Sequence, residues 1–356
     1  MSRLHFHALT VAEIRRETAD AISIAFDIPS ALKAAFAYAP GQYLTLRHHV
    51  GEEEIHRSYS LCSALADDEW RIGIREIPQG VFSTWANHRL KVGDTLECMA
   101  PDGRFCPVID PKATTHYVLF AVGSGITPCL SIAKTVLATA PFAQVTLVYG
   151  NRRASSTMFR EDLADLKNRY LAQFDLHCVF SREPPDIPLY HGRVDGAKVQ
   201  HFLQTLIPAA SIDQAFLCGP TAMLDEVEAV LRAAGVVEDK IHVERFGVGE
   251  LGALARDEVE TKTAAKVEVI IDGVRREISI HESHASILDA ARAAGLDLPF
   301  SCKSGVCATC RARVLEGKVH MTRNFALLKA DLEAGVVLSC QARPLTDRVV
   351  LSFDDR

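Results

Sequence analysis

Short apolar runs separated by turn residues fill the first third of the chain. Up to about residue 110 these β-like runs are AISIAFDI, GQYLTLRH, RSYSLCS, WRIGIREI and DTLECMAP. Several short strands with turn signals at such spacing are typical of a small antiparallel barrel. The sequence therefore predicts an antiparallel β-barrel domain over residues 1–110.

From about residue 114 the pattern changes to buried strands that alternate with helices. The continuous apolar runs are THYVLFAV, QVTLVYG, FDLHCVFS and QAFLCGP, and the helical patterns are PCLSIAKTVLATA, MFREDLADLKNRY and TAMLDEVEAVLRAAG. The last helix ends at Gly235, and glycine favours the position just after a helix. Alternating buried strands and helices indicate a parallel sheet with crossover helices. We therefore predict an α/β parallel-sheet domain over residues 111–246.

The remaining chain divides into a polar stretch and a small folded block. Residues 247–265 are polar and lack strong periodicity, so we predict an interdomain linker there. Residues 266–356 open with two strand-like runs, VEVIID and REISI, around the turn DG, and the helix SILDAARAAG follows. This order predicts a small α+β domain of the β-grasp type.

Composition and charge limit the class of protein. The 356 residues exceed one ordinary core, and 48% hydrophobic with 24% charged residues describes a soluble globular protein. A net charge of −6 argues against a nucleic-acid partner, and no apolar run reaches the ~18 residues of a membrane span. The N-terminus lacks the apolar core of a signal peptide, so we expect a cytoplasmic protein with reduced thiols.

Four of the 10 cysteines follow a metal-binding spacing. They form the pattern C-x4-C-x2-C followed by one distant cysteine, and they are Cys302, Cys307, Cys310 and Cys340. A disulfide interpretation is weak in a cytoplasmic chain, and zinc sites usually repeat a short C-x2-C pair. The spacing is that of a plant-type 2Fe-2S ferredoxin. Ser304, Gly305 and Ala308 leave room for backbone amides to approach the sulfurs, so the pattern predicts that these four cysteines bind a 2Fe-2S cluster.

Two segments of the barrel block carry groups suited to a phosphate-containing ligand. RSYS spans Arg57 to Ser60 within a predicted strand, and QGVFS reaches Ser83 through a predicted strand-to-helix turn at Gly80. Backbone amides at such a turn can bind a phosphate. Taken alone, an exposed arginine beside a strand tyrosine is common, so the two segments gain meaning only together.

A third segment, GSGITP, follows a buried strand and opens a helix. Gly123 and Gly125 let the backbone approach a pyrophosphate, whose charge is stabilised at a helix N-terminus. Thr127 and Pro128 end the segment, so it is not a G-x-G-x-x-G fingerprint. The context nevertheless predicts a dinucleotide site.

Together these segments resemble the ferredoxin–NADP reductase family. Further markers are YGNR at 149–152, CGP at 218–220 and an acidic–x–aromatic segment at 244–246. The resemblance implies an FAD site. In such a site an arginine neutralises the flavin phosphate, a tyrosine ring packs on the isoalloxazine, and a serine lies near flavin N5. The pyrophosphate lies at the turn that begins the helix. By position these residues are Arg57, Ser58, Tyr59, Ser60, Gly80, Val81 and Ser83.

The same resemblance implies a nicotinamide-nucleotide site. Cys218 would lie beside the nicotinamide, although a buried strand-end thiol without that role is the alternative. Glu244 matches the active-site glutamate, and Phe246 matches the aromatic that shields the flavin. The chain usually ends at that aromatic in this family, whereas here it continues. The remaining nucleotide contacts implied are Gly123, Gly125, Thr127, Pro128, Gly219 and Pro220.

FSRE places Ser181 and Arg182 after the third strand, where NADP-using members hold the 2′-phosphate. An arginine there offers charge-assisted hydrogen bonds to a phosphate dianion. We therefore expect NADPH rather than NADH, the alternative being a solvated loop arginine. Ser60, Cys218 and Glu244 are the predicted catalytic residues around the hydride path.

The order of flavin, nucleotide and ferredoxin domains resembles the reductase components of multicomponent oxygenases. This implies electron transfer from NADPH to FAD, to the 2Fe-2S cluster, and then to oxygenase subunits as the protein partner. The chain lacks a pair of Glu-x-x-His helices, so a di-iron centre would belong to that partner. Two alternatives stay open: a non-catalytic electron-carrier subunit, and an NADH-dependent reductase of a Rieske-type ring-hydroxylating oxygenase that binds FMN.

Overall fold

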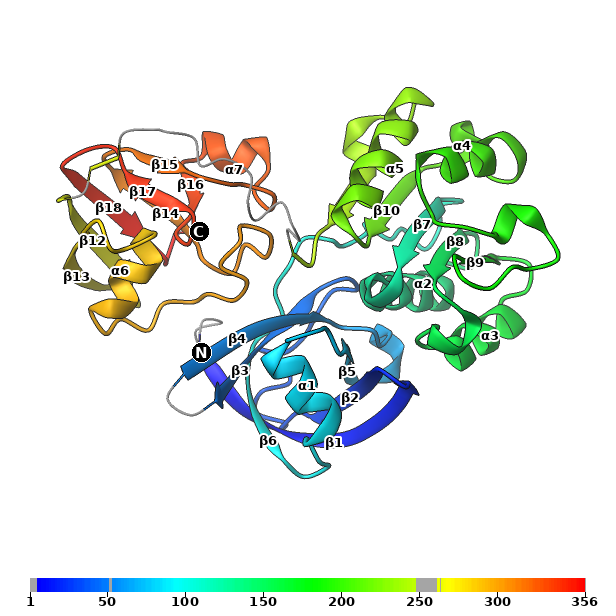
Figure 1. Ribbon diagram of the computed structural model, residues 1–356, viewed down its shortest axis with the longest axis horizontal. Coiled ribbons are helices and arrows are strands. Elements are labelled where there is room, and N and C mark those ends of the chain that lie inside the picture. The colour runs from blue at the N-terminus through cyan, green and yellow to red at the C-terminus, as the bar shows by residue number, and fades with distance from the viewer. Residues whose placement is uncertain (1–4, 51–52, 248–260, 263, 356) are drawn as a thin grey trace. The chain divides into compact units, whose positions relative to one another are not determined.

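A computed structural model describes residues 5–50, 53–247, 261–262 and 264–355 (Figure 1). The chain forms two compact units, one spanning His5–Phe246 and the other the C-terminal block from Gly247. The barrel and the parallel-sheet block thus share one unit. Most of the predicted linker, 248–260 and 263, lies outside the described residues. No described helix has both the length and the apolar character needed to cross a bilayer.

Six antiparallel strands form the N-terminal barrel in the order β4-β3-β6-β1-β2-β5. A bridge between Leu61 and Ile72 joins the end of β4 to β5 and closes the sheet on itself. Its interior contains buried aliphatic side chains such as Leu9, Ile24 and Leu46. The elements are β1 (Phe6–Thr18), β2 (Ala21–Asp27), β3 (Tyr43–Val50), β4 (Glu53–Ser60), β5 (Trp70–Arg75), α1 (Val81–His88) and β6 (Thr95–Met99).

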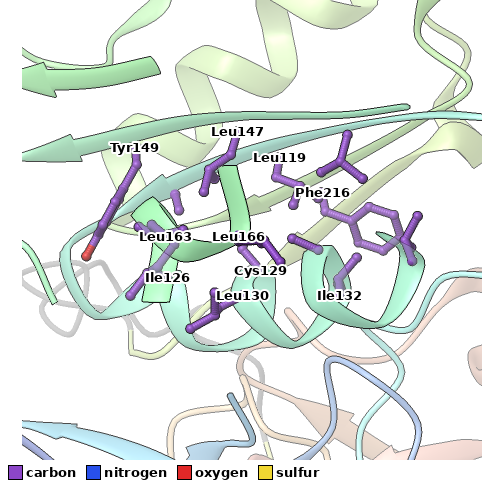
Figure 2. Close-up of a cluster of buried hydrophobic side chains, with 14 of the residues drawn as sticks. Leu119, Ile126, Cys129, Leu130, Ile132, Leu147, Tyr149, Leu163, Leu166 and Phe216 are labelled. Atoms are coloured by element: carbon purple, nitrogen blue, oxygen red, sulfur yellow. The ribbon is translucent and has the colours of Figure 1, made fainter. Parts of the chain in front are cut away.

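Five parallel strands form the second sheet, in the order β11-β10-β7-β8-β9. Helices α2 and α3 pack on one face, where Figure 2 shows Ile126, Cys129 and Leu130 against the strands, and α4 and α5 pack on a second core. The elements are β7 (His116–Val122), α2 (Ile126–Thr139), β8 (Gln144–Asn151), α3 (Arg160–Arg169), β9 (Phe174–Phe180), α4 (Gly196–Thr205), β10 (Gln214–Cys218), α5 (Thr221–Ala233) and β11 (Ile241–Glu244).

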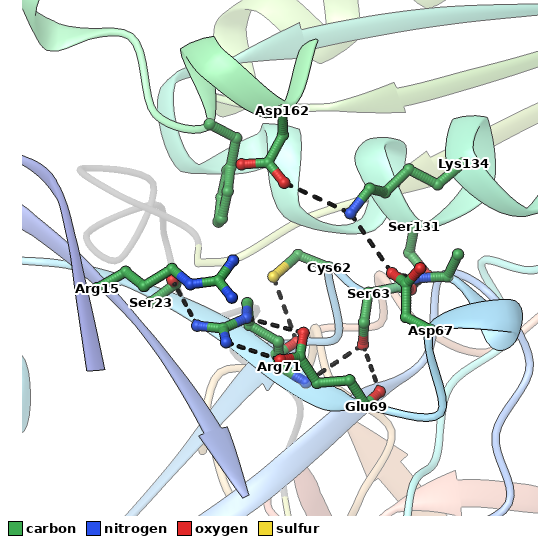
Figure 3. A network of polar contacts seen from close by, with 12 residues as sticks. Arg15, Ser23, Cys62, Ser63, Asp67, Glu69, Arg71, Ser131, Lys134 and Asp162 are labelled. Atoms are coloured by element: carbon green, nitrogen blue, oxygen red, sulfur yellow. Dashed lines mark hydrogen bonds and ion pairs between the residues drawn. The ribbon is translucent and has the colours of Figure 1, made fainter. Parts of the chain in front are cut away.

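Buried polar contacts join the barrel to the parallel-sheet block (Figure 3). The Ser131 hydroxyl of α2 donates to the Ser63 carbonyl oxygen at 2.7 Å. Lys134 Nζ of α2 also lies 3.4 Å from Asp67 of the barrel. These contacts help to hold the two blocks as one unit. Within the barrel, the buried guanidinium of Arg71 donates to Glu69 at 2.7 and 2.8 Å and contacts Glu13 on β1, and such a paired buried charge is costly to disrupt.

The C-terminal unit is a mixed sheet in the order β13-β12-β18-β14-β16, with a small β15-β17 ribbon. The turn DG joins β12 to β13 with φ of 51° at Asp272 and 73° at Gly273, the pair of positive angles that a type I′ hairpin requires. Helix α6 begins after Ser286, whose hydroxyl accepts the Asp289 N–H at 3.2 Å. The elements are β12 (Lys266–Ile271), β13 (Val274–Ser279), α6 (Ile287–Ala293), β14 (Arg311–Glu316), β15 (Val319–Met321), α7 (Lys329–Glu333), β16 (Val336–Leu338), β17 (Ala342–Pro344) and β18 (Arg348–Ser352).

Candidate functional site

Three predicted catalytic residues from distant parts of the chain meet in one place. Glu244 ends β11 and pairs in register with Cys218 at the end of β10. The hydroxyl of Ser60, at the end of β4, donates to Glu244 Oε2 at 3.4 Å. Burial raises the pKa of Glu244 to about 8, although the Ser60 hydrogen bond opposes the shift. The carboxyl is therefore largely protonated at neutral pH.

Two thiols that the sequence did not single out accompany Cys218 around this carboxyl. Burial raises the pKa of Cys218 well above its usual range, and the charge on Glu244 adds to the shift. The same two causes raise the pKa of Cys129, and the pKa of Cys106 rises to about 12. Cys218 thus stays a neutral thiol and contributes volume and polarisability rather than a nucleophile or base.

The barrel face beside this site carries the predicted flavin residues. Tyr59 and Arg57 share one face of β4, and the Tyr59 ring lies 5.6 Å from the Phe82 ring of α1. Arg57 is exposed and donates to the His56 carbonyl oxygen at 2.7 Å. Ser58 lies on the opposite face, with its hydroxyl 3.1 Å from that of Thr45. This arrangement leaves an aromatic surface and a cation side by side.

The predicted phosphate turn is the start of α1. Gly80 caps the helix, and Val81 is its first residue, 48% exposed. The Ser83 hydroxyl accepts the Ile77 N–H and donates to the Gly80 carbonyl oxygen, both at 3.2 Å. Ser83 therefore stabilises the turn, and the helix N-terminus supplies the backbone donors for an anion.

The glycine turn lies at the carboxyl end of β7, where ligands of open parallel sheets bind. Gly123 has a φ of +59°, and a Cβ atom on Gly125 would lie 2.1 Å from the Cys218 carbonyl oxygen. The Thr127 hydroxyl donates to the Ser124 carbonyl oxygen at 3.0 Å. Pro128 lies inside the first turn of α2, where its missing N–H costs nothing.

The neighbouring nucleotide residues occupy adjacent strand ends. Gly219 follows β10 and packs against Val122, and Pro220 caps α5. After β9, the Ser181 N–H donates to the Asn151 carbonyl oxygen at 3.0 Å and the Arg182 N–H donates to the Arg152 carbonyl oxygen at 2.9 Å. Three arginines, 152, 153 and 182, thus gather at one sheet edge, whereas Phe246 is exposed just after β11.

The four predicted cluster ligands come together as two pairs of thiols. A hydrogen bond from Cys307 lowers the pKa of Cys302 to about 5, and one from Cys310 lowers that of Cys340. The Ser304 N–H also donates to Cys302 Sγ at 3.4 Å. Among the described residues, no group of three or more histidine, cysteine, aspartate or glutamate side chains is placed to hold one metal ion. Two pairs are the arrangement that a two-iron cluster needs, since each iron takes two thiolates.

Comparison with known proteins gives the same three parts. Family models match an oxidoreductase FAD-binding domain at residues 8–106, an oxidoreductase NAD-binding domain at 119–229, and a 2Fe-2S iron–sulfur cluster binding domain at 269–345. The chain is 45% identical over 350 residues to one of the subunits of 1,2-phenylacetyl-CoA epoxidase of Escherichia coli K12, covering 98% of both chains. The chain belongs to the ferredoxin reductase family.

A second relative and a solved structure match over a similar length. The ferredoxin reductase component of 3-ketosteroid-9-alpha-monooxygenase from Rhodococcus rhodochrous is 35% identical, covering 97% of this chain and 96% of the relative. Phthalate dioxygenase reductase matches in fold, with a TM-score of 0.59 and 23% identity over 98% of both chains. The predicted fold class, FAD, a pyridine nucleotide and the 2Fe-2S cluster are thereby confirmed.

Proposed function

We propose that this reductase is the electron-transfer component of a phenylacetyl-CoA epoxidase complex. In that role it passes electrons from NADPH through FAD and the 2Fe-2S cluster to the di-iron oxygenase subunits. The similarity to the Escherichia coli protein over the whole of both chains carries the proposal. The segments YGNR, HGR, VERF and CKSGVCATCRARVLEGKV resemble the same protein.

The residues of the site divide the work of binding and positioning. Arg57 would hold the flavin phosphate, with the start of α1 as a second donor, and the Tyr59 ring would support the isoalloxazine. Ser60 and the protonated Glu244 would orient the nicotinamide against the flavin, and Cys218 would pack beside it. The bound flavin converts a two-electron hydride into single electrons, which a one-electron cluster can accept.

Reconstitution with oxygenase subunits tests the proposal. Purified reductase, mixed with the oxygenase subunits of a phenylacetyl-CoA epoxidase, should oxidise NADPH in a manner that depends on phenylacetyl-CoA and yields the epoxide. If NADPH oxidation did not depend on phenylacetyl-CoA although flavin and cluster were present, the proposal would be contradicted.

The 35% identity to a 3-ketosteroid-9-alpha-monooxygenase component favours a second candidate function, electron transfer to a steroid oxygenase. Replacing only the oxygenase in the same assay separates the two.

The preference for NADPH rests on Arg182. Arg182→Ala should raise KM for NADPH by about tenfold or more, because one charge-assisted bidentate contact to the 2′-phosphate is lost, and should leave kcat and NADH kinetics nearly unchanged. Arg169→Ala, which removes an arginine from the last turn of α3, is the control. Equal kcat/KM for NADH and NADPH in the unmodified protein would reject the preference.

A further inference from the structure

The last residue of β8 lies where a bound dinucleotide must cross the sheet. The glycine turn at 123–125 follows β7, and Ser181 and Arg182 follow β9, with β8 between these two strands. Gly150 of β8 pairs with Val122, and Asn151 pairs with Phe180 at the end of β9. A ligand that spans from the glycine turn to the Arg182 loop therefore passes over Asn151.

The side chain of Asn151 is buried and unsatisfied. It is 8% exposed, and neither Nδ2 nor Oδ1 has a hydrogen-bond partner among the described residues. The nearby Tyr149 hydroxyl gives its hydrogen to the Gly123 carbonyl oxygen at 3.0 Å, so it donates nothing to this amide. A buried amide without partners costs free energy, and such groups call for an absent ligand or water.

Strand geometry directs this amide toward the glycine turn. Residues two apart on a strand share a face, so Asn151 lies on the same face as Tyr149. Figure 2 shows Tyr149 at the end of the buried cluster near Ile126, where α2 begins. The Asn151 carbonyl oxygen also accepts the Ser181 N–H, so the residue contacts the second nucleotide loop through its backbone.

We propose that Asn151 binds the adenosine side of the pyridine nucleotide, with Nδ2 donating to, and Oδ1 accepting from, its ribose–pyrophosphate portion. This inference rests on the proposed nucleotide site and adds a residue to it. A carboxamide supplies one acceptor and two donors, which suits a ligand that carries both phosphate oxygens and ribose hydroxyls. Pyrophosphate alone would need only donors.

The test compares two buried asparagines in the flavin-loaded protein. Asn151→Leu removes the unsatisfied amide, so the free protein should melt at the same temperature or higher. Its Kd for NADP+ should rise by about tenfold, the effect of about 1.4 kcal/mol of lost hydrogen bonding. The control is Asn87, 5% exposed, whose amide donates to Ser83 and Ile74 carbonyl oxygens at 2.9 and 3.2 Å. Asn87→Leu should lower the melting temperature and leave Kd unchanged.

Fragments locate the contact along the dinucleotide. Isothermal titration should find ADP-ribose binding weakened in Asn151→Leu and nicotinamide mononucleotide binding unaffected. A lower melting temperature with Kd within about twofold of the unmodified protein would overturn the inference, as would a loss confined to nicotinamide mononucleotide. Asn151→Ala gives the same comparison if the leucine variant does not fold. Failure of the unmodified protein to bind NADP+ or NAD+ would overturn the nucleotide site itself, and this role with it.

Discussion

Among single residues, Glu244 has the largest described consequence for pH dependence. Its pKa rises from 4.5 to about 8 because the carboxyl is buried between β10 and the end of β4. Between these two values the folded chain keeps a proton that the unfolded chain has released. The contribution of Glu244 to the free energy of unfolding is therefore complete below about pH 4.5, decreases as pH rises, and is lost above about pH 8.

Glu244→Gln should remove that pH dependence. Near pH 4.5 the variant and the unmodified protein should melt together, and near pH 9 the variant should melt several degrees higher, because it buries no charge and the unmodified protein loses stability over the whole interval. Flavin fluorescence during heating follows the unit that contains this site. Ser60→Ala is the companion variant and should move the transition to higher pH, since the Ser60 hydrogen bond lowers the pKa. An equal difference at both pH values would contradict the assignment.

Short motifs pointed to the candidate catalytic residues but not to their protonation. Ser60, Cys218 and Glu244 each end a strand, and strand ends are where the motifs RSYS, CGP and VERF occur. The shifted pKa depends on burial, which is a property of the folded chain and not of any motif. The thiols of Cys106 and Cys129, whose pKa values the charge on Glu244 helps to raise, were not singled out by the sequence either. Asn151 was visible only as part of YGNR, because its missing partners are a property of the fold.

Among the elements, the junction of β7, α2 and β10 forms the candidate nucleotide site. Gly125 at the start of α2 approaches the backbone of Cys218 so closely that no side chain fits. Close packing of a helix against a strand thus requires glycine here, in addition to the backbone approach to an anion that we propose for this turn.

Gly125→Ala should destabilise the unit by about 1–3 kcal/mol, because the clash is with backbone atoms that cannot turn aside. Nucleotide Kd should rise in the same variant, since the glycine turn must shift. Gly196→Ala is the matched control: it opens α4, and its nearest atom, Val230 Cγ2, would lie at 3.3 Å. Urea denaturation and NADP+ titration on both variants measure the effects. Equal stability of the two variants would contradict the packing argument.

Regular elements were predicted where the apolar pattern was strong. The strands of the parallel sheet through β10 and helices α2, α3 and α5 follow continuous apolar runs or helical periodicity. The longest strand, β1, was not anticipated, because its 13 residues include charged positions such as Glu13 and Arg15 that face outward or join buried ion pairs. Helix α4 was also missed, since its short pattern GAKVQHFLQT buries only Val199 and Phe202.

In the whole molecule, the iron–sulfur unit and the flavin–nucleotide unit have separate cores. The buried cluster around Val267 and Leu351 contains only residues of the C-terminal block, and the other three clusters contain none of them. Loss of one unit should therefore leave the other folded.

Cys340→Ala should separate the two electron steps. One of four thiolates is removed, so the cluster and its low-temperature EPR signal should be lost. Reduction of ferricyanide by NADPH should continue at near the original rate, because flavin reduction depends on the other unit. Electron delivery to the oxygenase should fall to background. Delivery that persists without the cluster signal would mean that the flavin reduces the oxygenase directly.

The two thiol pairs need very different lengths of chain. Cys302 and Cys307 belong to one loop, whereas Cys310 meets Cys340 only when β16 pairs with β14, where Arg311 is opposite Leu338 and the Ser339 N–H donates to the Cys310 carbonyl oxygen. During synthesis the first pair leaves the ribosome well before the second can form. A polypeptide released before Cys340 would thus hold flavin and oxidise nucleotide yet lack a finished cluster. Formation of the complete cluster therefore requires synthesis of the chain through Cys340.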